Sequence, residues 1–249
     1  MFRYDSVVVG AGITRSVLAE QLASRLQQRV LLIDRRTYLG GLCSDHRDGT
    51  GSPIHTHTPH LLHTQSRRVW DYVQGFGPWR EHRLSVRILI EGKRISLPLN
   101  LKGLRSFFSK AEALSREQKL LAHFGPDRFV PIPQLARSRD KALEKLAHLV
   151  CEQIYQPYLA KRTGLESGKS PPALCVRMPV STCQEDHYYV EPFQGIPADS
   201  YCDFFGRLLN HPGIHRLLHV EALDILELNE NSGTPRLFGQ PFNLSLIHI

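Results

Sequence analysis

Near its start the chain passes from a run of β-branched residues directly into a glycine turn and then into a helical pattern. Residues 7–9 are all valine, as in a strand that is buried on both faces. Gly10 and Gly12 form a Gly-x-Gly turn, and apolar residues recur with helical spacing over residues 13–26. A glycine turn at the N-terminus of a helix binds the diphosphate of a dinucleotide. This opening therefore predicts an α/β fold built on a Rossmann-like parallel sheet.

An acidic residue follows the second expected strand. Residues 30–33 form an apolar run that ends on Asp34, close to the spacing of about 20 residues at which a Rossmann unit places a carboxylate on the adenosine ribose. The fingerprint is incomplete, because Arg15 stands where the third glycine of G-x-G-x-x-G normally allows close packing of helix on strand. We expect Arg15 to point outward or to displace the helix. On this motif alone, an α/β domain that binds no nucleotide remains the alternative.

A second pair of glycines indicates which dinucleotide is bound. Asp34 is followed by R-R-T-Y-L-G-G at residues 35–41, and an arginine-containing run that ends on paired glycines after the ribose acid is typical of flavoproteins that bind FAD. Gly40 and Gly41 carry no side chain, so the backbone can approach the diphosphate and ribityl chain of the cofactor. The order and spacing of these motifs predict FAD as the cofactor.

Composition argues against several other classes of protein. The 249 residues carry 31 Lys and Arg against 24 Asp and Glu, a net charge of +7 that suits an anionic ligand. The basic residues are dispersed, and no basic stripe with interleaved aromatics indicates nucleic acid. No apolar run is long enough to span a membrane, and the first strand leaves no room for a signal peptide. The five cysteines are widely spaced without a C-x-x-C pair, which indicates reduced thiols in a cytoplasmic protein.

Residues 55–64 read H-T-H-T-P-H-L-L-H-T and raise the question of a metal site. Histidines that bind a metal need a common face and usually a carboxylate or cysteine partner. Here Pro59 interrupts the segment, which has neither helical nor clean strand periodicity throughout. We therefore expect no metal site, and we interpret the segment as a loop that passes close to the cofactor.

Several segments resemble the UDP-galactopyranose mutase family. The run T-P-H-L-L-H-T at residues 58–64, followed by R-R-V-W-D-Y-V at residues 67–73, is similar to the family's G-P-H-I-F-H-T and R-V-W-D-Y. The run E-D-H-Y-Y-V-E-P-F-Q-G-I-P-A-D-S-Y at residues 185–201 is similar to the family's D-D-R-Y-F-x-D-x-Y-Q-G-M-P-x-x-G-Y. Further segments extend the resemblance over most of the chain, from Tyr4 to about Ile214.

The resemblance implies three structural parts: an FAD-binding Rossmann-like domain, an inserted helical domain and an antiparallel β-sheet. Local patterns agree, since two short strands are expected around residues 91–93 and helical spacing occurs over residues 115–124 and 140–159. A helix capped by Ser200 or Asp199 and a strand near residues 217–226 are expected further on. The expected boundaries are residues 1–82 and 199–243 for the FAD-binding domain, residues 83–100 and 176–198 for the sheet, and residues 101–175 for the helical insertion.

The resemblance also implies a function, the interconversion of UDP-galactopyranose and UDP-galactofuranose. In this family reduced FAD attacks the anomeric carbon, displaces UDP and holds the sugar covalently while its ring opens and recloses. The reaction has no net redox change and needs a closed, dry site. The resemblance implies a UDP-sugar as partner and a role in cell-wall or surface-polysaccharide biosynthesis, and it leaves a homo-oligomer open.

Motifs and resemblance together define the expected site residues. The resemblance places His60 beside the flavin ring as the catalytic residue, and it places His82, Tyr158 and Phe193 in the uridine and sugar pocket. The expected cofactor-binding residues are Gly10, Gly12, Ile13, Thr14, Asp34, Arg35, Gly40, Gly41, Leu42, His60 and Leu61. Loop packing for His60 and core packing for the three pocket residues are the alternatives.

Three positions depart from the family's substrate pattern. The family's K-Q-W-G reads K-R-T-G here, so Thr163 replaces the tryptophan that walls the sugar site. Ser181 replaces the arginine that grips the diphosphate of UDP, and Phe193 lacks the hydroxyl of the family's tyrosine. The loss of a charge-assisted phosphate contact costs about 1.5–3 kcal/mol of binding free energy. An FAD-dependent oxidoreductase with another substrate and a non-catalytic flavoprotein relative therefore remain alternatives.

The last six residues, L-S-L-I-H-I, are the translation of CTGTCTCTTATACACATC, a transposase end sequence used in sequencing adapters. The family continues well past this length. We therefore expect residues 244–249 to be a translated adapter, and the chain to be a fragment that is inactive by itself. A genuine apolar terminal strand is the alternative.

Overall fold

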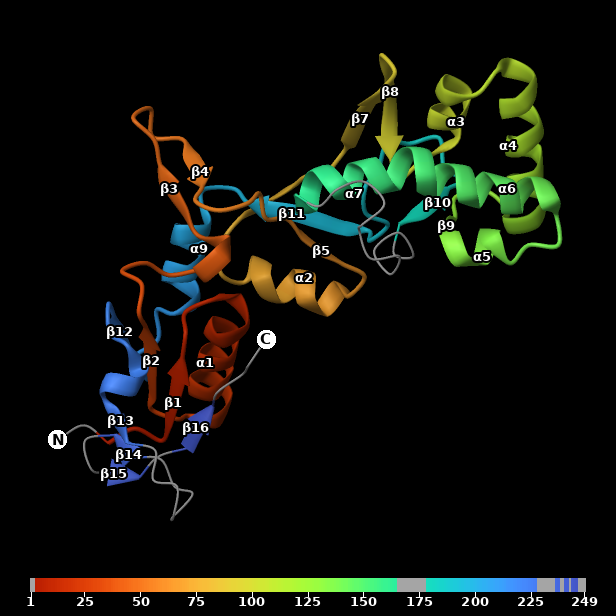
Figure 1. Ribbon diagram of the computed structural model, residues 1–249. Coiled ribbons are helices and arrows are strands. Elements are labelled where there is room, and N and C mark those ends of the chain that lie inside the picture. Colours follow the sequence, from red (N-terminus) through yellow and green to blue (C-terminus); the bar gives the residue numbers. More distant parts are fainter. Residues whose placement is uncertain (1–2, 165–177, 228–235, 238–239, 242, 246–249) are drawn as a thin grey trace. The chain divides into compact units, whose positions relative to one another are not determined.

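The computed structural model describes residues 3–164, 178–227, 236–237, 240–241 and 243–245. The chain divides into two compact units, one formed by Met1–His82 with Glu191–Ile249 and the other by Arg83–Val190. Figure 1 labels the helices and strands of both units. Each unit has a hydrophobic core of its own, so each is a separate packing body.

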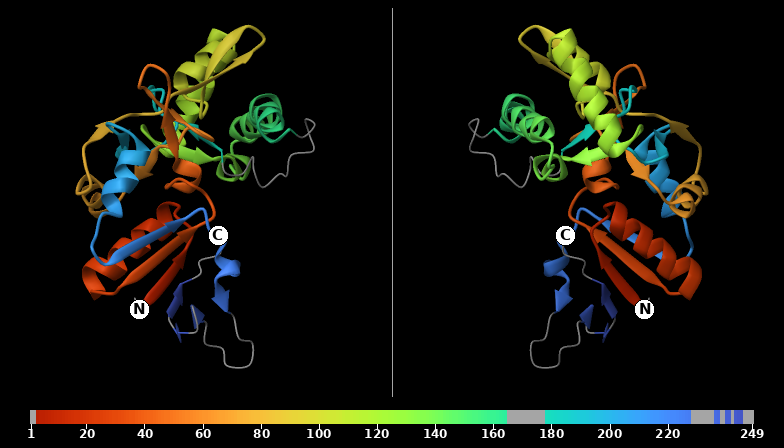
Figure 2. Two further views of the ribbon diagram at one scale, coloured as in Figure 1. Left: turned by 90° about the vertical axis from the view of Figure 1, so that its left-hand side faces the viewer. Right: turned by 90° about the vertical axis from the view of Figure 1, so that its right-hand side faces the viewer.

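A parallel sheet forms the centre of the first unit. Its strands lie in the order β12 (Ile214–Leu218), β2 (Val30–Asp34), β1 (Ser6–Val9) and β16 (Asn243–Ser245), and every neighbouring pair is parallel. Helix α1 (Ile13–Leu26) connects β1 to β2 and lies against the strands, as Figure 2 shows. Adjacent parallel strands joined through a helix form a Rossmann-like unit, so the predicted fold class is confirmed.

Both faces of this sheet are covered, because successive side chains of a strand point to opposite faces. Val8 and Leu32 pack against Ala19 and Ala23 of α1. Their chain neighbours pack on the other face, against the 3-10 turn η3 (Ala222–Asp224) and the strand β13 (Leu226–Glu227). This double burial explains the uninterrupted apolar runs at β1 and β2.

An antiparallel sheet of three strands completes the core of the first unit. Its central strand β11 (Phe193–Pro197) pairs with β5 (Leu62–Thr64) and with β6 (Trp79–Glu81). Helices α2 (Arg67–Gln74) and α9 (Tyr201–Leu208) pack with this sheet through a shared aromatic cluster. The cluster includes Trp70, Trp79, Phe193, Phe204 and Phe205.

The boundaries of α9 and β12 test two expectations about the last part of this unit. Of the two predicted cap residues, Ser200 and Asp199, it is Ser200 that caps α9, because its Oγ accepts the Asp203 N–H at 2.9 Å. The strand predicted near residues 217–226 is shifted, since β12 covers Ile214–Leu218. The strand begins directly after Gly213, whose carbonyl accepts the Val30 N–H at 2.8 Å, and it ends before His219, which has a left-handed φ of 60°.

Short elements make up the rest of the first unit. They are η1 (Gly41–Cys43), β3 (Asp45–Arg47), β4 (Pro53–His55), β14 (Arg236–Leu237) and β15 (Gln240–Pro241). In β16, Leu244 pairs with Val7 of β1. Residues 246–249 lie outside the described part of the chain. Any sequence can form backbone hydrogen bonds, so this pairing does not show whether residues 244–249 are a translated adapter. The adapter origin therefore stays a prediction.

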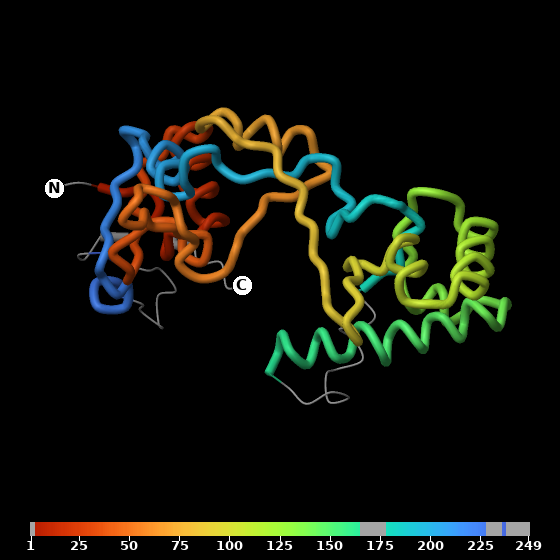
Figure 3. The backbone as a smooth tube through the Cα atoms, turned by 90° about the horizontal axis from the view of Figure 1, so that it is seen from above, coloured from red at the N-terminus to blue at the C-terminus, as the bar shows by residue number. Residues whose placement is uncertain are grey.

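Helices dominate the second unit. Helix α6 (Lys141–Val150) continues through a π-helical turn, η2 (Cys151–Tyr155), into α7 (Gln156–Thr163), and Figure 3 shows the three as one long helix. Pro157 explains the π turn, because it has no N–H for a regular helical hydrogen bond. The other helices are α3 (Leu101–Phe107), α4 (Lys110–Phe124) and α5 (Ile132–Ala136). The helical spacing predicted over residues 115–124 and 140–159 is therefore confirmed.

The strands of the second unit form two separate pairs. β7 (Val86–Ile90) and β8 (Lys93–Leu97) make a hairpin, with φ values of 49° at Glu91 and 77° at Gly92 in the turn. β9 (Phe129–Pro131) pairs with β10 (Pro179–Ser181). Residues 83–100 and 176–198 were expected to form one sheet part, but among the described residues their only β-ladder contact is an isolated β-bridge between Leu99 and Val180. The strand β11 instead pairs within the first unit.

A partly buried carboxylate, that of Asp186, holds together three segments of the second unit. Asp186 Oδ1 accepts hydrogen bonds from Ser96 Oγ at 2.7 Å and from Asn100 Nδ2 at 2.9 Å, and its Oδ2 accepts from Arg87 at 2.8 Å. Burial alone raises the pKa of the Asp186 carboxyl, but these hydrogen bonds outweigh burial and the net pKa is lowered. The ionised form is therefore stabilised by folding.

We expect Asp186→Asn to destabilise the protein at pH 7 by about 1–2 kcal/mol, because the charge-assisted bonds are lost. The native pKa lies below the unfolded value of about 3.9, so this contribution is complete above that value and disappears as pH falls through the native pKa. Urea unfolding of both proteins between pH 7 and pH 3 measures the difference. The exposed pair of Arg67 with Asp71 supplies a control, since Asp71→Asn should cost less than about 1 kcal/mol at any pH. A difference that is constant with pH would contradict the assignment.

Candidate functional site

A cavity of about 510 Å³ opens at the carboxyl end of the parallel sheet in the first unit. Its wall comes from the ends of β1 and β2, the start of α1, the turn η1 and the segment after β12. The lining residues are Val9, Gly10, Gly12, Arg15, Ile33, Asp34, Arg35, Arg36, Gly41, Leu42, Val220, Glu221 and Ala222. In an open parallel sheet, ligands bind at this edge.

Glycines shape the floor of the cavity. Gly10 has a φ of 102°, a conformation that residues with a side chain rarely adopt. A Cβ on Gly41 would lie 3.2 Å from the Cα of Gly12, so the two glycine turns touch each other backbone to backbone. A Cβ on Gly12, in contrast, would meet no protein atom within 4 Å. Gly12 therefore leaves space for a ligand at the N-terminus of α1.

Asp34 connects the glycine turn before α1 to the segment that follows β2. Its side chain is 5% exposed, its Oδ2 accepts the Ala11 N–H at 2.6 Å, and its Oδ1 accepts the Arg36 N–H at 2.8 Å. Each carboxylate oxygen has a second lone pair, so a ribose hydroxyl can still donate to it. The sequence predicted that Asp34 contacts the ribose. The structure shows in addition that the Asp34 carboxylate holds the backbone of Ala11 and Arg36 in place.

The position of the Arg15 side chain differs from the one expected, since it neither points outward nor displaces the helix. Its side chain is half-buried and folds over the glycine turn, where its Nη1 would lie 2.7 Å from a Cβ on Gly10. Helix α1 still packs closely on the sheet, because Ser16, Ala19 and Ala23 are buried on the face that meets it. The small residues that follow Arg15 thus do the packing that the third glycine normally allows.

The expected cofactor-binding residues divide into two groups. Gly10, Gly12, Asp34, Arg35, Gly41 and Leu42 line the cavity, whereas Ile13, Thr14, Gly40, His60 and Leu61 are not among its lining residues. Gly40 supports the turn from behind, since a Cβ there would lie 2.8 Å from the ring of Phe205. Residues 220–222 were missed. Because β12 runs parallel to β2, the residues after it reach the same sheet edge, and only this pairing could have indicated them.

His60 lies in a loop held by its neighbours. Its N–H donates to His55 Nδ1 at 3.1 Å, and its ring Nδ1 lies 2.7 Å from the Thr58 carbonyl. The carbonyl can only accept, so Nδ1 carries a proton, and in the neutral tautomer Nε2 is the acceptor. Tyr201 donates to the His60 carbonyl at 3.2 Å. Within the described residues, no three His, Cys, Asp or Glu side chains are grouped so as to hold a metal ion.

Phe193 and His82, two expected pocket residues, belong to the first unit. The ring of Phe193 stacks on Trp70 with centroids 6.1 Å apart, and the guanidinium carbon of Arg67 lies 5.7 Å from its centroid. These contacts account for an aromatic residue at position 193 without a ligand. The His82 N–H donates to the Gln194 carbonyl at 3.1 Å, and its side chain is exposed.

Tyr158, the third expected pocket residue, belongs to the second unit. Its hydroxyl accepts from Arg162 at 3.3 Å. Burial, together with a hydrogen bond to Tyr158, raises the pKa of the Tyr188 phenol to about 12, so Tyr188 keeps its proton near neutral pH. Thr163 is exposed and donates to the Leu159 carbonyl at 2.8 Å.

Ser181 is 2% exposed, and its Oγ accepts the Cys183 N–H at 3.1 Å. An arginine at this position would have to displace its neighbours. The serine that replaces the family's arginine therefore has a structural role in the turn after β10.

Comparison with known proteins links this geometry to a family. Residues 8–76 match the NAD(P)-binding Rossmann-like domain, and residues 153–242 match the UDP-galactopyranose mutase family. The chain is 32% identical over 209 residues to dTDP-fucopyranose mutase of Escherichia coli, covering 84% of this chain and 54% of that protein. It is 31% identical over 218 residues to a probable UDP-galactopyranose mutase of Klebsiella pneumoniae, covering 87% and 56%. The chain is a relative of the UDP-galactopyranose mutases. The resemblance inferred from the sequence is thus confirmed.

The fold of this chain is similar to that of several solved structures. Reduced UDP-galactopyranose mutase superposes with a TM-score of 0.59 at 12% identity, over 88% of this chain and 48% of that one. A putative protoporphyrinogen oxidase from Exiguobacterium sp. 255-15 superposes with a TM-score of 0.55 at 15% identity, over 97% and 58%. The chain spans about half the length of the curated mutases it matches. None of the helices in the described part of the chain is long and apolar enough to cross a membrane.

Proposed function

We propose that the whole protein is an FAD-dependent mutase that converts the pyranose ring of a nucleoside-diphosphate sugar into a furanose. The observation that carries this proposal is the similarity of 31–32% identity, over 84–87% of this chain, to two proteins named as sugar-nucleotide mutases. One of them is named for a UDP-sugar and the other for a dTDP-sugar. UDP-galactopyranose and dTDP-fucopyranose are therefore the two substrates to test first.

The cavity fits the adenosine diphosphate half of FAD. Helix α1 begins after its N-cap Gly12, with no side-chain cap and no acidic residue in its first turn, an arrangement that favours an anion at this end of the helix. Gly12 leaves open space at that point, and Asp34 offers a carboxylate for the ribose. Gly10, Gly12 and Gly41 would hold the diphosphate, with Arg35 and Arg36 beside it.

A bound flavin in its reduced form would supply the nucleophile for a sugar transfer without net redox change. The residues of this chain would bind and orient it: the N-terminus of α1 neutralises the diphosphate, and Asp34 fixes the ribose. His60 presents an acceptor nitrogen from a loop held by His55 and Tyr201. We propose His60 as the residue beside the flavin ring, and His82, Tyr158 and Phe193 as contributors to the sugar-nucleotide site.

Two measurements on the full-length protein test this function. The purified protein should be yellow and retain stoichiometric flavin after gel filtration. After reduction with dithionite, it should convert UDP-galactopyranose or dTDP-fucopyranose into the furanose form, seen by chromatography. Absence of bound flavin after refolding with excess FAD would refute the cofactor. The same gel filtration reports whether the protein is a homo-oligomer, and cell fractionation tests the proposed cytoplasmic location.

A redox FAD-dependent oxidoreductase is the second candidate. Thr163 and Ser181 depart from the mutase pattern, and the fold also matches a putative protoporphyrinogen oxidase. A protein of this kind would bind flavin and form no furanose from either sugar nucleotide. It would instead turn over electrons with an added acceptor, which the dithionite assay separates from mutase chemistry.

A further inference from the structure

Arg15 is the one lining residue of the cavity that breaks the dinucleotide fingerprint. It follows Gly12, the N-cap of α1, by three residues and therefore belongs to the first turn of the helix. Its side chain folds back over Gly10, with Cδ 2.9 Å and Nη1 2.7 Å from the place of a Cβ on that glycine. Arg15 and the N-terminal end of α1 therefore line the same cavity.

The charges of the cavity make that space favourable for an anion. Three arginines line it, Arg15, Arg35 and Arg36, against two carboxylates. Both carboxylates already accept backbone N–H groups, Asp34 from Ala11 and Arg36, and Glu221 from Ala222 at 3.2 Å. Positive charge is thus in excess at the point where the helix N-terminus adds its own.

We propose that Arg15 binds the diphosphate of the dinucleotide directly and replaces the third motif glycine by a charge contact. This inference rests on the proposed function, since it concerns the cofactor of the same site. A guanidinium can donate two parallel hydrogen bonds to a phosphate, a contact that a glycine at this position cannot make. Close packing of α1 is already provided by Ser16, Ala19 and Ala23, so position 15 is available for this role.

Affinity measurements on four variants test the proposal, with FAD, ADP and adenosine titrated into the full-length apoprotein. Arg15→Gln should weaken FAD and ADP binding on the order of 10- to 100-fold, because a charge-assisted phosphate contact is lost. Adenosine, which has no phosphate, should bind both proteins equally. The FAD affinity of Arg15→Lys should lie between those of the wild type and Arg15→Gln. Arg15→Gly, which restores the motif glycine, should also weaken FAD binding.

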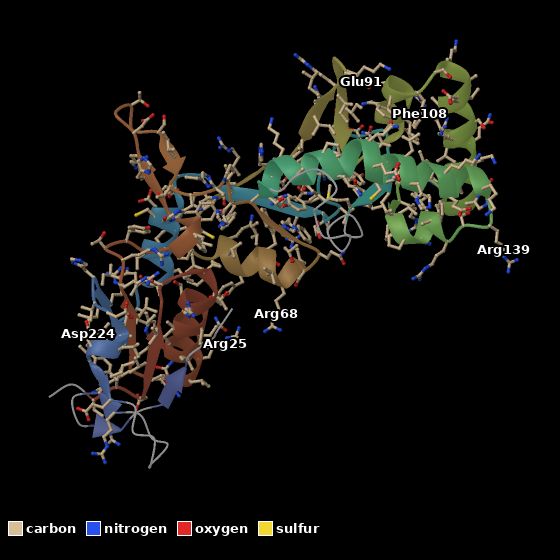
Figure 4. All side chains as sticks on the ribbon, viewed as in Figure 1. Arg25, Arg68, Glu91, Phe108, Arg139 and Asp224 are labelled. Carbon is tan, nitrogen blue, oxygen red and sulfur yellow. The ribbon has the colours of Figure 1, made fainter. Side chains whose placement is uncertain are left out.

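The matched control is Arg25→Gln on the same helix. Arg25 lies in the last turn of α1, about 15 Å along the axis from Arg15, and Figure 4 labels its side chain there. Its removal should leave FAD affinity unchanged. Thermal unfolding of each apoprotein checks that the variants fold as the wild type does.

The outcomes separate this inference from the function on which it rests. Unchanged or tighter FAD binding by Arg15→Gln and Arg15→Gly would overturn it, because packing or obstruction would then be the role of Arg15. If the wild type bound ADP but not FAD, and Arg15→Gln weakened ADP, the Arg15 contact would stand and the FAD assignment would fall. A wild type that bound neither would overturn both.

Discussion

Gly12→Val should weaken the affinity for FAD about 100-fold or more, equivalent to about 3 kcal/mol of binding free energy, while the protein stays folded. A Cβ at Gly12 meets no protein atom within 4 Å, so the branched side chain projects into the cavity and fills the place of the diphosphate. Gly12 has a φ of −75°, which valine adopts without strain. Loss of glycine as the residue before α1 should cost no more than about 1 kcal/mol of stability.

Flavin fluorescence titration measures the FAD affinity of the variant, and thermal unfolding measures its stability. Gly49→Val is the matched control, because a Cβ on Gly49 also meets nothing within 4 Å, yet this residue does not line the cavity. It should change neither the FAD affinity nor the unfolding temperature appreciably. Wild-type affinity in a folded Gly12→Val protein would show that the diphosphate binds away from α1.

Gly195→Ala should destabilise the first unit by about 2–3 kcal/mol, because the added methyl group has no room. Gly195 lies in the central strand β11, and a Cβ there would be 2.7 Å from the Arg80 carbonyl oxygen and 2.7 Å from the ring of Trp70. The carbonyl belongs to the neighbouring strand β6, so relief would require movement of the ladder. The unfolding temperature should fall by about 4–12 °C for a chain of this size.

Gly206→Ala is the opposite case and serves as the control. Gly206 lies within helix α9, and a Cβ there meets no atom within 4 Å. Alanine should therefore stabilise the protein by about 0.5–1 kcal/mol through helix propensity and a less flexible unfolded chain. Equal unfolding temperatures for the two variants in differential scanning calorimetry would mean that β11 is not held between Trp70 and β6.

The predicted local structure was mostly correct where a residue type dictates the backbone. Gly10 and Gly92 have the positive φ that turns at those positions need, and Ser200 caps the helix that follows it. The strand after Gly213 was placed three residues late, because the apolar residues that suggested it continue into the 3-10 turn η3. Periodicity cannot separate a strand from an apolar turn that packs on the same core.

The sequence by itself determined the strand–glycine–helix opening, the second glycine pair and the relationship to the mutases, because these depend on short segments with fixed spacing. Tertiary structure alone decided that residues 220–222 complete the cavity, that Arg15 turns toward Gly10 and that Phe193 stacks on Trp70. Each of these features depends on how strands pair or side chains pack in space. Such contacts form only in the folded chain, so they cannot be predicted from a local pattern of residues.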